Sequence, residues 1–479
     1  MKPRLTVGLL ALAATALAVR LLWPARPAAP VPVSPPSSAR LGRVDTPRAF
    51  RAVVVQPRWQ ATDFVSATRF RAWLRGQLEL AQPHVAPDRP TLIVLTELNG
   101  MPLALRGAPL AARMPTLQAG LALVLFKHLP GALLLSITRR VSLVRGLLLA
   151  LAPDNARLYL ESCRDLARKF GVYLACGTST LPHFRLDGGR VVIDGTGVYN
   201  TGPVFAPDGQ LIGLTDKVYL TPDEEAGGLD LTPGRLADLR VFPTPVGDLA
   251  TATSLDAFQS DLIAHVEAQG ATVLLQPDAN ASAWTAKEGL PPDPATVRNQ
   301  PVAWLESSWQ AVQRSSTLRY ALNPMVVGNL LGVPFDGQSA IVARAGEASA
   351  PRSYVMTSPR PGFLALAPWV AEGSDAMLRQ VGEALAAGRG NRAYLQTVLA
   401  ADAHLPPTTG AEPTASPTDE ALRAWLNGQA RWMSPSGMRV VDVAWPLGFL
   451  GLALFGLGRP GRRWPALALG LLGAALTVL

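Results

Sequence analysis

The sequence is poor in cysteine and histidine. Cys163 and Cys176 are the two cysteines among 479 residues, and five histidines are scattered along the chain. Two cysteines are too few for a disulfide scaffold or a cysteine-ligated zinc site, and the histidines have no metal-ligand spacing. The sequence therefore predicts no metal centre, and nothing in it points to a cofactor.

Charged residues are also sparse, and most of them are basic. They make up 16% of the chain, with a net charge of +9. The positive charges do not form a stripe with interleaved aromatic residues, which argues against a nucleic-acid partner. Several flank apolar segments instead. This placement favours an anionic membrane surface, so we predict membrane lipid as a partner.

Apolar runs occur at both ends of the chain. Residues 1–23 begin with basic residues and become apolar, which is typical of a signal peptide or signal anchor. Residues 443–458 and 464–479 flank a basic turn, and each run is a little shorter than the roughly 20 residues of a membrane span. We interpret 439–479 as a transmembrane hairpin; two buried helices of a soluble protein are the alternative. The positive-inside rule then puts the main domain on the non-cytoplasmic face of the cell membrane.

Composition also predicts the domain boundaries. Residues 24–49 form a Pro-rich linker, and 50–370 form the main domain. Residues 371–438 are predicted as a helical and linker region with helices at 374–388 and 419–433, which leads the chain back to the membrane.

The main domain alternates short apolar strands with amphipathic helices. Helical patterns cover 155–170 and 258–270, and a strand meander with Asp-Gly turn signals at 194–195 and 208–209 covers 190–214. This alternation predicts a layered α/β domain. The expected strands are 51–57, 91–97, 171–179, 246–255 and 271–277.

Residues 101–154 form an insert between one strand and the next helix. Its apolar runs are broken by basic residues, a pattern typical of helices that lie on a bilayer surface. We interpret it as a membrane-facing lid at the pocket mouth. An ordinary packed helical extension or a dimer contact is the alternative.

Several motifs occur in a specific order within 50–370. They are VVVQP, LTELNG, LARKFGVYLACGTS, NTGPVFAPDGQ, TDKVYLTP and QPDANASAW. In this order the chain resembles the carbon-nitrogen hydrolase (nitrilase) superfamily, and most of all the nitrilase-like domain of apolipoprotein N-acyltransferase. The resemblance implies an α-β-β-α sandwich, here with terminal membrane helices, and a catalytic glutamate, lysine and cysteine.

The resemblance assigns two of these three residues and lacks the third. Glu97 ends its strand as the glutamate does, and Lys217 follows the meander as the lysine does. The cysteine position holds Ser254, or Thr253 if the register differs by one. In such a triad the glutamate takes the thiol proton, the thiolate attacks carbon, and the lysine stabilises the oxyanion. A serine hydroxyl is far less acidic than a thiol.

The resemblance also implies two further pocket residues and a role for one cysteine. Glu225 stands eight residues after the lysine and Asp256 two residues after Ser254, as the acyltransferase pattern requires. Cys176 lies in a core strand and is interpreted as a buried structural thiol.

Together these features predict an exported, membrane-tethered domain that is catalytically silent and binds a ligand or partner. The alternative is an active amidase or N-acyltransferase at the membrane that uses Ser254, Glu97 and Lys217. A purely structural subunit that forms a homo-oligomer through its sheets is a third interpretation.

Overall fold

The computed structural model describes most of the main domain. The described residues are 44–281, 287–288, 298–354, 357–367, 394–408 and 411–433. The expected signal segment at 1–23, the hairpin at 439–479 and the helix at 374–388 lie outside them, as does most of the Pro-rich linker. The end of that linker already belongs to the first strand.

A seven-stranded mixed sheet forms one half of the domain. Its order is β20-β1-β3-β4-β6-β5, with β7 paired to β6. The neighbours β1, β3 and β4 are parallel, and the other pairs are antiparallel. The strands are β1 (Arg48–Gln56), β3 (Thr91–Val94), β4 (Tyr173–Ala175), β5 (Ser179–Asp187), β6 (Arg190–Phe205), β7 (Leu211–Asp216) and β20 (Thr397–Leu405).

A six-stranded sheet forms the other half, in the order β19-β16-β13-β10-β9-β8. Here β9, β10 and β13 are parallel. The strands are β8 (Phe242–Thr244), β9 (Gly247–Thr251), β10 (Val273–Leu275), β13 (Tyr320–Asn323), β16 (Ala340–Ala343) and β19 (Phe363–Leu366).

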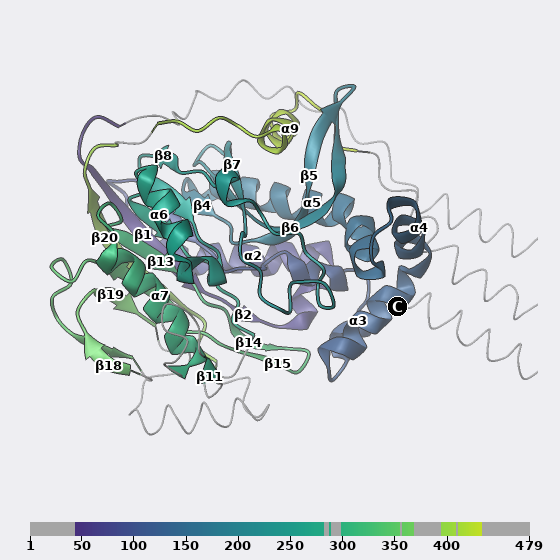
Figure 1. Ribbon diagram of the computed structural model, residues 1–479, viewed down its shortest axis with the longest axis horizontal. Helices are drawn as coiled ribbons and strands as arrows, with labels where there is room; N and C mark the ends of the chain where they lie inside the picture. Colours follow the sequence, from purple (N-terminus) through teal and green to yellow (C-terminus); the bar gives the residue numbers. More distant parts are fainter. Residues whose placement is uncertain are drawn as a thin grey trace, which may run out of the picture.

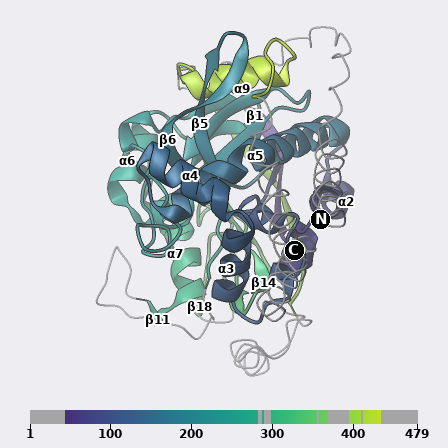
Figure 2. The same cartoon turned by 90° about the vertical axis from the view of Figure 1, so that its right-hand side faces the viewer.

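Helices cover the outer face of each sheet. Helices α2 (Ala67–Ala81) and α5 (Leu143–Phe170) lie on the first sheet, and α6 (Ser260–Ala268) and α7 (Gln300–Arg314) on the second, on opposite sides in Figure 2. In β1, Val53 packs toward the helices, whereas Val54 packs into the core between the sheets. Two-sided burial explains why these strands are continuously apolar. The described part is a mixed α/β fold with the four layers that the sequence predicted (Figure 1).

Smaller elements decorate the layers. They are β2 (Arg58–Trp59), β14 (Val327–Leu330) and β15 (Val333–Asp336) in one ribbon, the pairs β11 (Lys287–Glu288) with β12 (Arg298–Asn299) and β17 (Arg352–Tyr354) with β18 (Thr357–Arg360), and the 3-10 helices η1 (Ala61–Phe64), η2 (Gln82–His84), η3 (Met101–Leu105), η4 (Ala111–Arg113), η5 (Leu236–Asp238) and η6 (Ser254–Phe258).

The insert forms helices at one end of the body. Helices α3 (Leu117–Lys127) and α4 (Leu129–Arg139) meet at 80°, and α5 starts within the insert, twelve residues before the expected helix at 155–170. Among the described helices none is long and apolar enough to cross a bilayer alone, although the bent α3–α4 pair reaches that length and composition. Three large apolar side chains of α4 are exposed: Leu133 at 47%, Leu134 at 54% and Ile137 at 67%.

The region expected to be helix and linker contains a strand. Within 371–438, residues 397–405 form β20, which pairs with β1 over nine residues, and helix α9 (Pro417–Leu426) packs beside β5 (Figure 1). The expected helix at 419–433 is therefore shorter and starts earlier. Asp419 stabilises its start, because its carboxylate caps the backbone at Ser416 and also pairs with Arg240. Strand β20 and helix α9 therefore pack onto the main domain.

One local prediction from the sequence is wrong. Asp194 and Gly195 do not make a turn but lie inside β6, where the register opposite β5 shifts and Gly195 has φ +69°. The β5–β6 turn lies instead at Gly188 and Gly189, both with positive φ.

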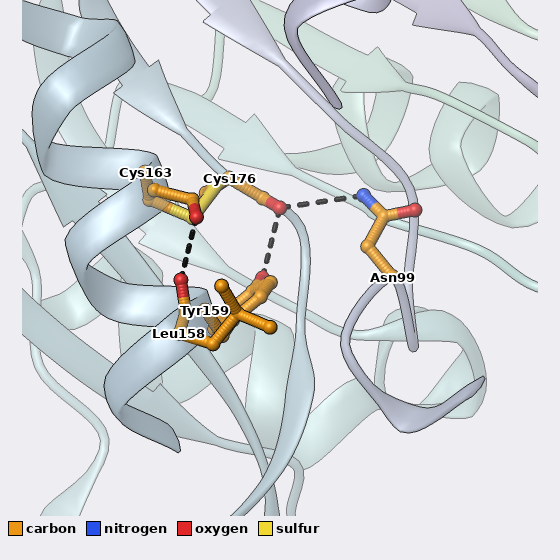
Figure 3. The surroundings of a disulfide bond; sticks show 6 residues. Asn99, Leu158, Tyr159, Cys163 and Cys176 are labelled. Atoms are coloured by element: carbon orange, nitrogen blue, oxygen red, sulfur yellow. Dashed lines mark hydrogen bonds between the residues drawn. A yellow bond between two sulfur atoms is a disulfide. The ribbon is translucent and has the colours of Figure 1, made fainter. Parts of the chain in front are cut away.

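The two cysteines are joined to each other, which corrects the interpretation of Cys176 as a free thiol. Cys163 in α5 and Cys176 directly after β4 form a disulfide with a Cα–Cα distance of 6.0 Å (Figure 3). Both residues are fully buried. A single disulfide is compatible with the lack of a disulfide scaffold.

Candidate active site

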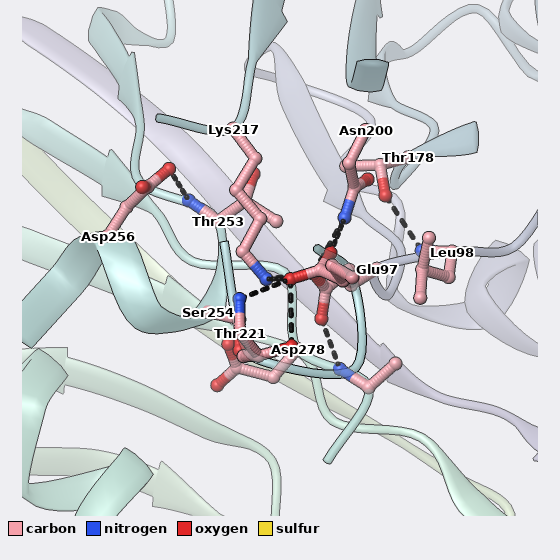
Figure 4. A network of polar contacts seen from close by, with 12 residues as sticks. Glu97, Leu98, Thr178, Asn200, Lys217, Thr221, Thr253, Ser254, Asp256 and Asp278 are labelled. Atoms are coloured by element: carbon pink, nitrogen blue, oxygen red, sulfur yellow. Dashed lines mark hydrogen bonds and ion pairs between the residues drawn. The ribbon is translucent and has the colours of Figure 1, made fainter. Parts of the chain in front are cut away.

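Three chain segments bring the predicted residues to one end of the sandwich. Glu97 lies in the loop after β3, Lys217 directly after β7, and Ser254 at the start of η6 after β9. The strands β3 and β9 belong to different sheets, so the site lies where the two sheets end together (Figure 4). All three residues are buried.

Lys217 is held between two carboxylates. Its Nζ lies 2.8 Å from Glu97 Oε1 and 2.6 Å from Glu224 Oε2. Asn200 Nδ2 donates to both carboxylates, at 2.9 Å to Glu97 Oε1 and 2.8 Å to Glu224 Oε1. The sequence predicted that Glu97 and Lys217 share a pocket, and the structure brings them into direct contact.

The second glutamate is Glu224 and not Glu225. The Glu225 side chain is exposed, whereas Glu224 is buried against Lys217. The reason is local: Glu224 Oε2 reaches back to accept from the Thr221 amide at 2.9 Å and the Thr221 hydroxyl at 3.1 Å. This Thr-x-x-Glu spacing is a capping-box pattern, which the sequence TPDE contains.

Ser254 lies on a turn with unusual backbone geometry. It has φ +52° and is 3% exposed, and its Oγ accepts a hydrogen bond of 2.8 Å from Trp304 Nε1. Positive φ in a non-glycine residue is costly and is retained where the surrounding structure enforces it, often at functional sites. Thr253, the alternative in the register, has φ −77° and precedes η6 as its N-cap.

Asp256 joins the Ser254 turn to the chain after Lys217. Its carboxylate accepts from the amides of Val218 at 3.1 Å, Tyr219 at 2.7 Å and Thr253 at 3.1 Å. Burial raises its pKa to about 7, against the lowering effect of these amides and of Lys217. Asp256 therefore holds two pocket segments together and makes no hydrogen bond to Lys217.

The two carboxylates on Lys217 differ in acidity. Burial raises the pKa of Glu97, whereas the Lys217 ammonium and its hydrogen bonds hold the pKa of Glu224 below its ordinary value despite burial. Their combined charge raises the pKa of Lys217, although burial alone would lower it. Glu224 is thus the permanent partner of an ammonium ion, and Glu97 is the carboxylate suited to exchanging a proton.

A further buried carboxyl group, which the sequence did not identify, lies beside this cluster. Asp278 Oδ2 accepts from Asn323 Nδ2 at 2.5 Å and Gln276 Nε2 at 3.2 Å. Burial raises its pKa well above the ordinary range, and the negative charge of Glu97 adds to the effect. The next residue, Ala279, donates its amide to Glu97 Oε2 at 3.0 Å. The QPDANASAW motif begins at Gln276 and contains Asp278, so it could have indicated this residue.

The chemical groups of the site form an acid–base cluster. They are a buried ammonium ion, one carboxylate that stays ionised, one that can take up a proton, and a hydroxyl on a strained turn. In the described part of the chain, no group of three or more histidine, cysteine, aspartate or glutamate residues could hold a metal ion.

A family model matches part of the chain. Residues 148–353, less than half of the chain, are similar to the carbon-nitrogen hydrolase family. The matched stretch includes Lys217, Glu224 and Ser254, and it begins after Glu97. A comparison with curated proteins found no match.

Several solved structures are similar to the chain. A carbon-nitrogen hydrolase from Helicobacter pylori is 17% identical with a TM-score of 0.43, covering 80% of this chain and 95% of its own. A branch 10 nitrilase-superfamily member from Saccharomyces cerevisiae is 16% identical with a TM-score of 0.42, covering 81% and 97%. An amidase from Nesterenkonia is 16% identical with a TM-score of 0.40, covering 71% and 96%.

Proposed function

We propose that this nitrilase-superfamily domain keeps the binding pocket of a carbon-nitrogen hydrolase but does not form an acyl-enzyme. The observation that carries the proposal is the environment of Ser254. Its Oγ accepts from Trp304, and among the described residues no hydrogen bond joins it to Glu97 or Lys217. A hydroxyl without a bonded base is a poor nucleophile.

The neighbouring groups support the same proposal. Serine hydrolases use a histidine or a neutral lysine as base, but Lys217 is an ammonium ion held by two carboxylates, which raise its pKa further. Glu97 already accepts three hydrogen bonds, from Lys217, Asn200 and Ala279. The same groups suit binding, because an amide ligand can donate to Glu97 and accept from Lys217.

Thiol restoration tests the proposal. The purified native chain should not hydrolyse simple amides, nitriles or p-nitrophenyl esters. Ser254→Cys should place a thiol beside a buried ammonium ion, which lowers thiol pKa values, and iodoacetamide should label it quickly near pH 7. Ser349→Cys, at an exposed serine in a loop, is the matched control for an ordinary thiol. Equal labelling rates at the two positions would contradict the proposal of a retained pocket.

The alternative is an active amidase or N-acyltransferase of the apolipoprotein type that uses Ser254 with Glu97 and Lys217. Two observations favour it: the raised pKa of Glu97, which makes it a stronger base than an ordinary carboxylate, and the enforced positive φ of Ser254. Turnover by the native chain that is lost in Ser254→Ala would establish this alternative.

We also propose that the domain is exported and lies against a membrane. Disulfides such as Cys163–Cys176 are typical of oxidising compartments. The exposed apolar side chains of α4, followed by Arg139 and Arg140, suit contact with anionic lipid, as expected for the lid interpretation of 101–154. Protease added to intact spheroplasts should digest the domain, and full protection would contradict the orientation.

Lipid contact has its own test. Replacing Leu133, Leu134 and Ile137 together by serine should weaken co-sedimentation with anionic vesicles, because apolar area buried in the bilayer is lost. Leu80, which is 45% exposed on α2, provides the control position. If its replacement has an equal effect, the contact is not specific to α4.

A further inference from the structure

The disulfide lies directly behind the loop that carries Glu97. Cys163 comes from the middle of α5, and Cys176 follows β4 (Figure 3). The carbonyl oxygen of Cys176 accepts from the Tyr159 hydroxyl at 2.9 Å and from Asn99 Nδ2 at 3.3 Å. Asn99 lies two residues after Glu97, so the bonded cysteine contacts the Glu97 loop through one side chain.

The residues after Cys176 bind the same loop on both sides of Glu97. The Thr178 amide donates to the Thr96 carbonyl at 3.3 Å, and the Leu98 amide donates to Thr178 Oγ1 at 2.7 Å. The Gly100 amide donates to the Thr178 carbonyl at 3.1 Å. The backbone on each side of Glu97 is therefore fixed by one short turn.

The turn after Cys176 packs tightly against the backbone of the Glu97 loop. Gly177 has φ +75°, and a Cβ at this position would lie 1.8 Å from the Thr96 carbonyl oxygen. Leu98 also has positive φ, at +55°, so the Glu97 loop is in a conformation that needs external support. A shift of the turn after Cys176 must therefore move the Glu97 backbone.

Other supports of Glu97 come from different elements. Its side chain is bonded by Lys217, Asn200 and the Ala279 amide, which hold the carboxylate and not the loop backbone. The turn after β4 is tied to its neighbours by backbone bonds, such as Cys176 N to Pro203 O at 3.2 Å. Helix α5 adds a rigid support to this turn through the disulfide and the Tyr159 hydroxyl.

We propose that the Cys163–Cys176 disulfide is a positioning element for Glu97, which links the geometry of the pocket to the oxidation state of the protein. The role of Glu97 as a pocket residue rests on the proposed function. The mechanical link between disulfide and loop does not. Reduction by a dithiol, which converts the disulfide to two thiols and is itself oxidised to a disulfide, removes the covalent link between the turn at 176–178 and α5. The Glu97 carboxylate then samples positions away from Lys217.

The mechanical link is tested by hydrogen exchange. In the full chain, Cys163→Ala with Cys176→Ala should raise the exchange rate of amides at 95–101 by on the order of tenfold, while peptides from β9 and β10 change little. Leu166→Ala, a larger deletion on α5 three residues from Cys163, is the control: it lowers global stability and leaves the ratio between these peptides unchanged. Exchange at 95–101 that rises no more than in the control overturns the proposal.

A milder variant covers the case in which the double variant does not fold. Tyr159→Phe keeps the disulfide and the ring and removes only the hydroxyl bond to Cys176. It should raise the exchange rate of the amides at 95–101, but by less than the double variant does. An unchanged rate there would also contradict the proposal.

The positioning role has a separate readout in the Ser254→Cys background. Removal of the disulfide should slow iodoacetamide labelling of position 254 by about tenfold near pH 7 and move its pH profile upward, because the thiolate is the reactive form. A stability loss alone does not move this profile. If Ser254→Cys does not react even with the disulfide intact, the proposed function fails, and the hydrogen exchange result decides the disulfide proposal on its own.

Discussion

The two halves of the pocket differ in how completely their polar groups are bonded. In the lysine half, Lys217, Glu97, Glu224 and Asn200 form a network in which each carboxylate has several donors, although Asn200 Oδ1 has no hydrogen-bond partner among the described residues. In the serine half, Ser254 Oγ accepts a single bond from Trp304. Unpaired buried ions are strongly disfavoured, so the charged groups of the lysine half persist because they are paired with one another. Ser254, by contrast, has no hydrogen-bonded base among the described residues. This difference supports the proposed binding without covalent chemistry.

The largest expected effect on stability comes from removing the ammonium group of Lys217. Lys217→Met should destabilise the domain by about 3–5 kcal/mol, because two buried carboxylates lose their shared counter-ion. Urea unfolding measures the change. Lys169→Met is the matched control, since Lys169 is an exposed lysine 3.7 Å from Glu79, and it should cost less than about 1 kcal/mol. Similar costs at both positions would contradict the buried network.

The two carboxylates should respond to pH in opposite directions. Glu224, whose pKa is lowered, contributes stability above its ordinary pKa of 4.5 that is lost as the pH falls through its lower folded value. Glu97, whose pKa is raised, contributes stability that is present below 4.5 and is lost as the pH rises through its higher folded value. At pH 7, Glu224→Gln should therefore cost about 2–3 kcal/mol and Glu97→Gln less.

Unfolding measured from pH 3 to 8 checks this prediction. The difference between native protein and Glu224→Gln should shrink toward low pH. The native protein should lose stability relative to Glu97→Gln as the pH rises above 4.5. Parallel pH dependences for the two variants would show that the carboxylates are equivalent and would remove the assignment of Glu97 as the proton-accepting group.

A smaller effect is expected in the serine half. Trp304→Phe removes the donor to Ser254 Oγ and keeps most of the ring packing against Phe258. The expected cost is about 1 kcal/mol, the size of one neutral hydrogen bond, as measured by thermal unfolding. A loss of stability comparable to that of Lys217→Met would mean that the Trp304–Ser254 hydrogen bond stabilises the domain as much as the ion pairs of Lys217 do.

The smallest effect is expected at Asp278. Burial raises the pKa of Asp278 well above the ordinary range and so favours its neutral form, which Asp278→Asn imitates with a neutral polar group of similar shape. The expected change is below about 1 kcal/mol at pH 7, measured by urea unfolding. A cost of several kcal/mol would indicate an ionised Asp278 and a second charged centre in the pocket.

The sequence predicted those parts of the fold in which local pattern and tertiary environment agree. The apolar runs at 91–97 and 271–277 contain strands, because burial on both faces removes any need for polar alternation. By contrast, β20 at 397–405 forms only because β1 offers an edge nine residues long, which no local pattern reveals. Asp194 and Gly195 have the sequence of a turn, but they lie inside β6, where the register of the long β5–β6 hairpin shifts.

The same distinction applies to the site. Glu97 and Lys217 were predicted because each lies in a long motif. The choice of Glu225 over Glu224 was wrong because spacing alone does not tell which neighbouring side chain faces inward, although the Thr221 capping pattern carries that information. The disulfide was missed because the approach of Cys163 to Cys176 depends on how α5 packs on the sheet.

Intact-protein mass spectrometry shows whether position 254 forms an acyl-enzyme. The native chain, Ser254→Ala and Ser254→Cys would each be incubated with a p-nitrophenyl ester near pH 7 and quenched in acid. The account predicts an acyl adduct on Ser254→Cys and none on the native chain, since the lysine half of the pocket is intact and the nucleophile lacks a base. An adduct on the native chain that is absent from Ser254→Ala would contradict the account and establish a serine enzyme.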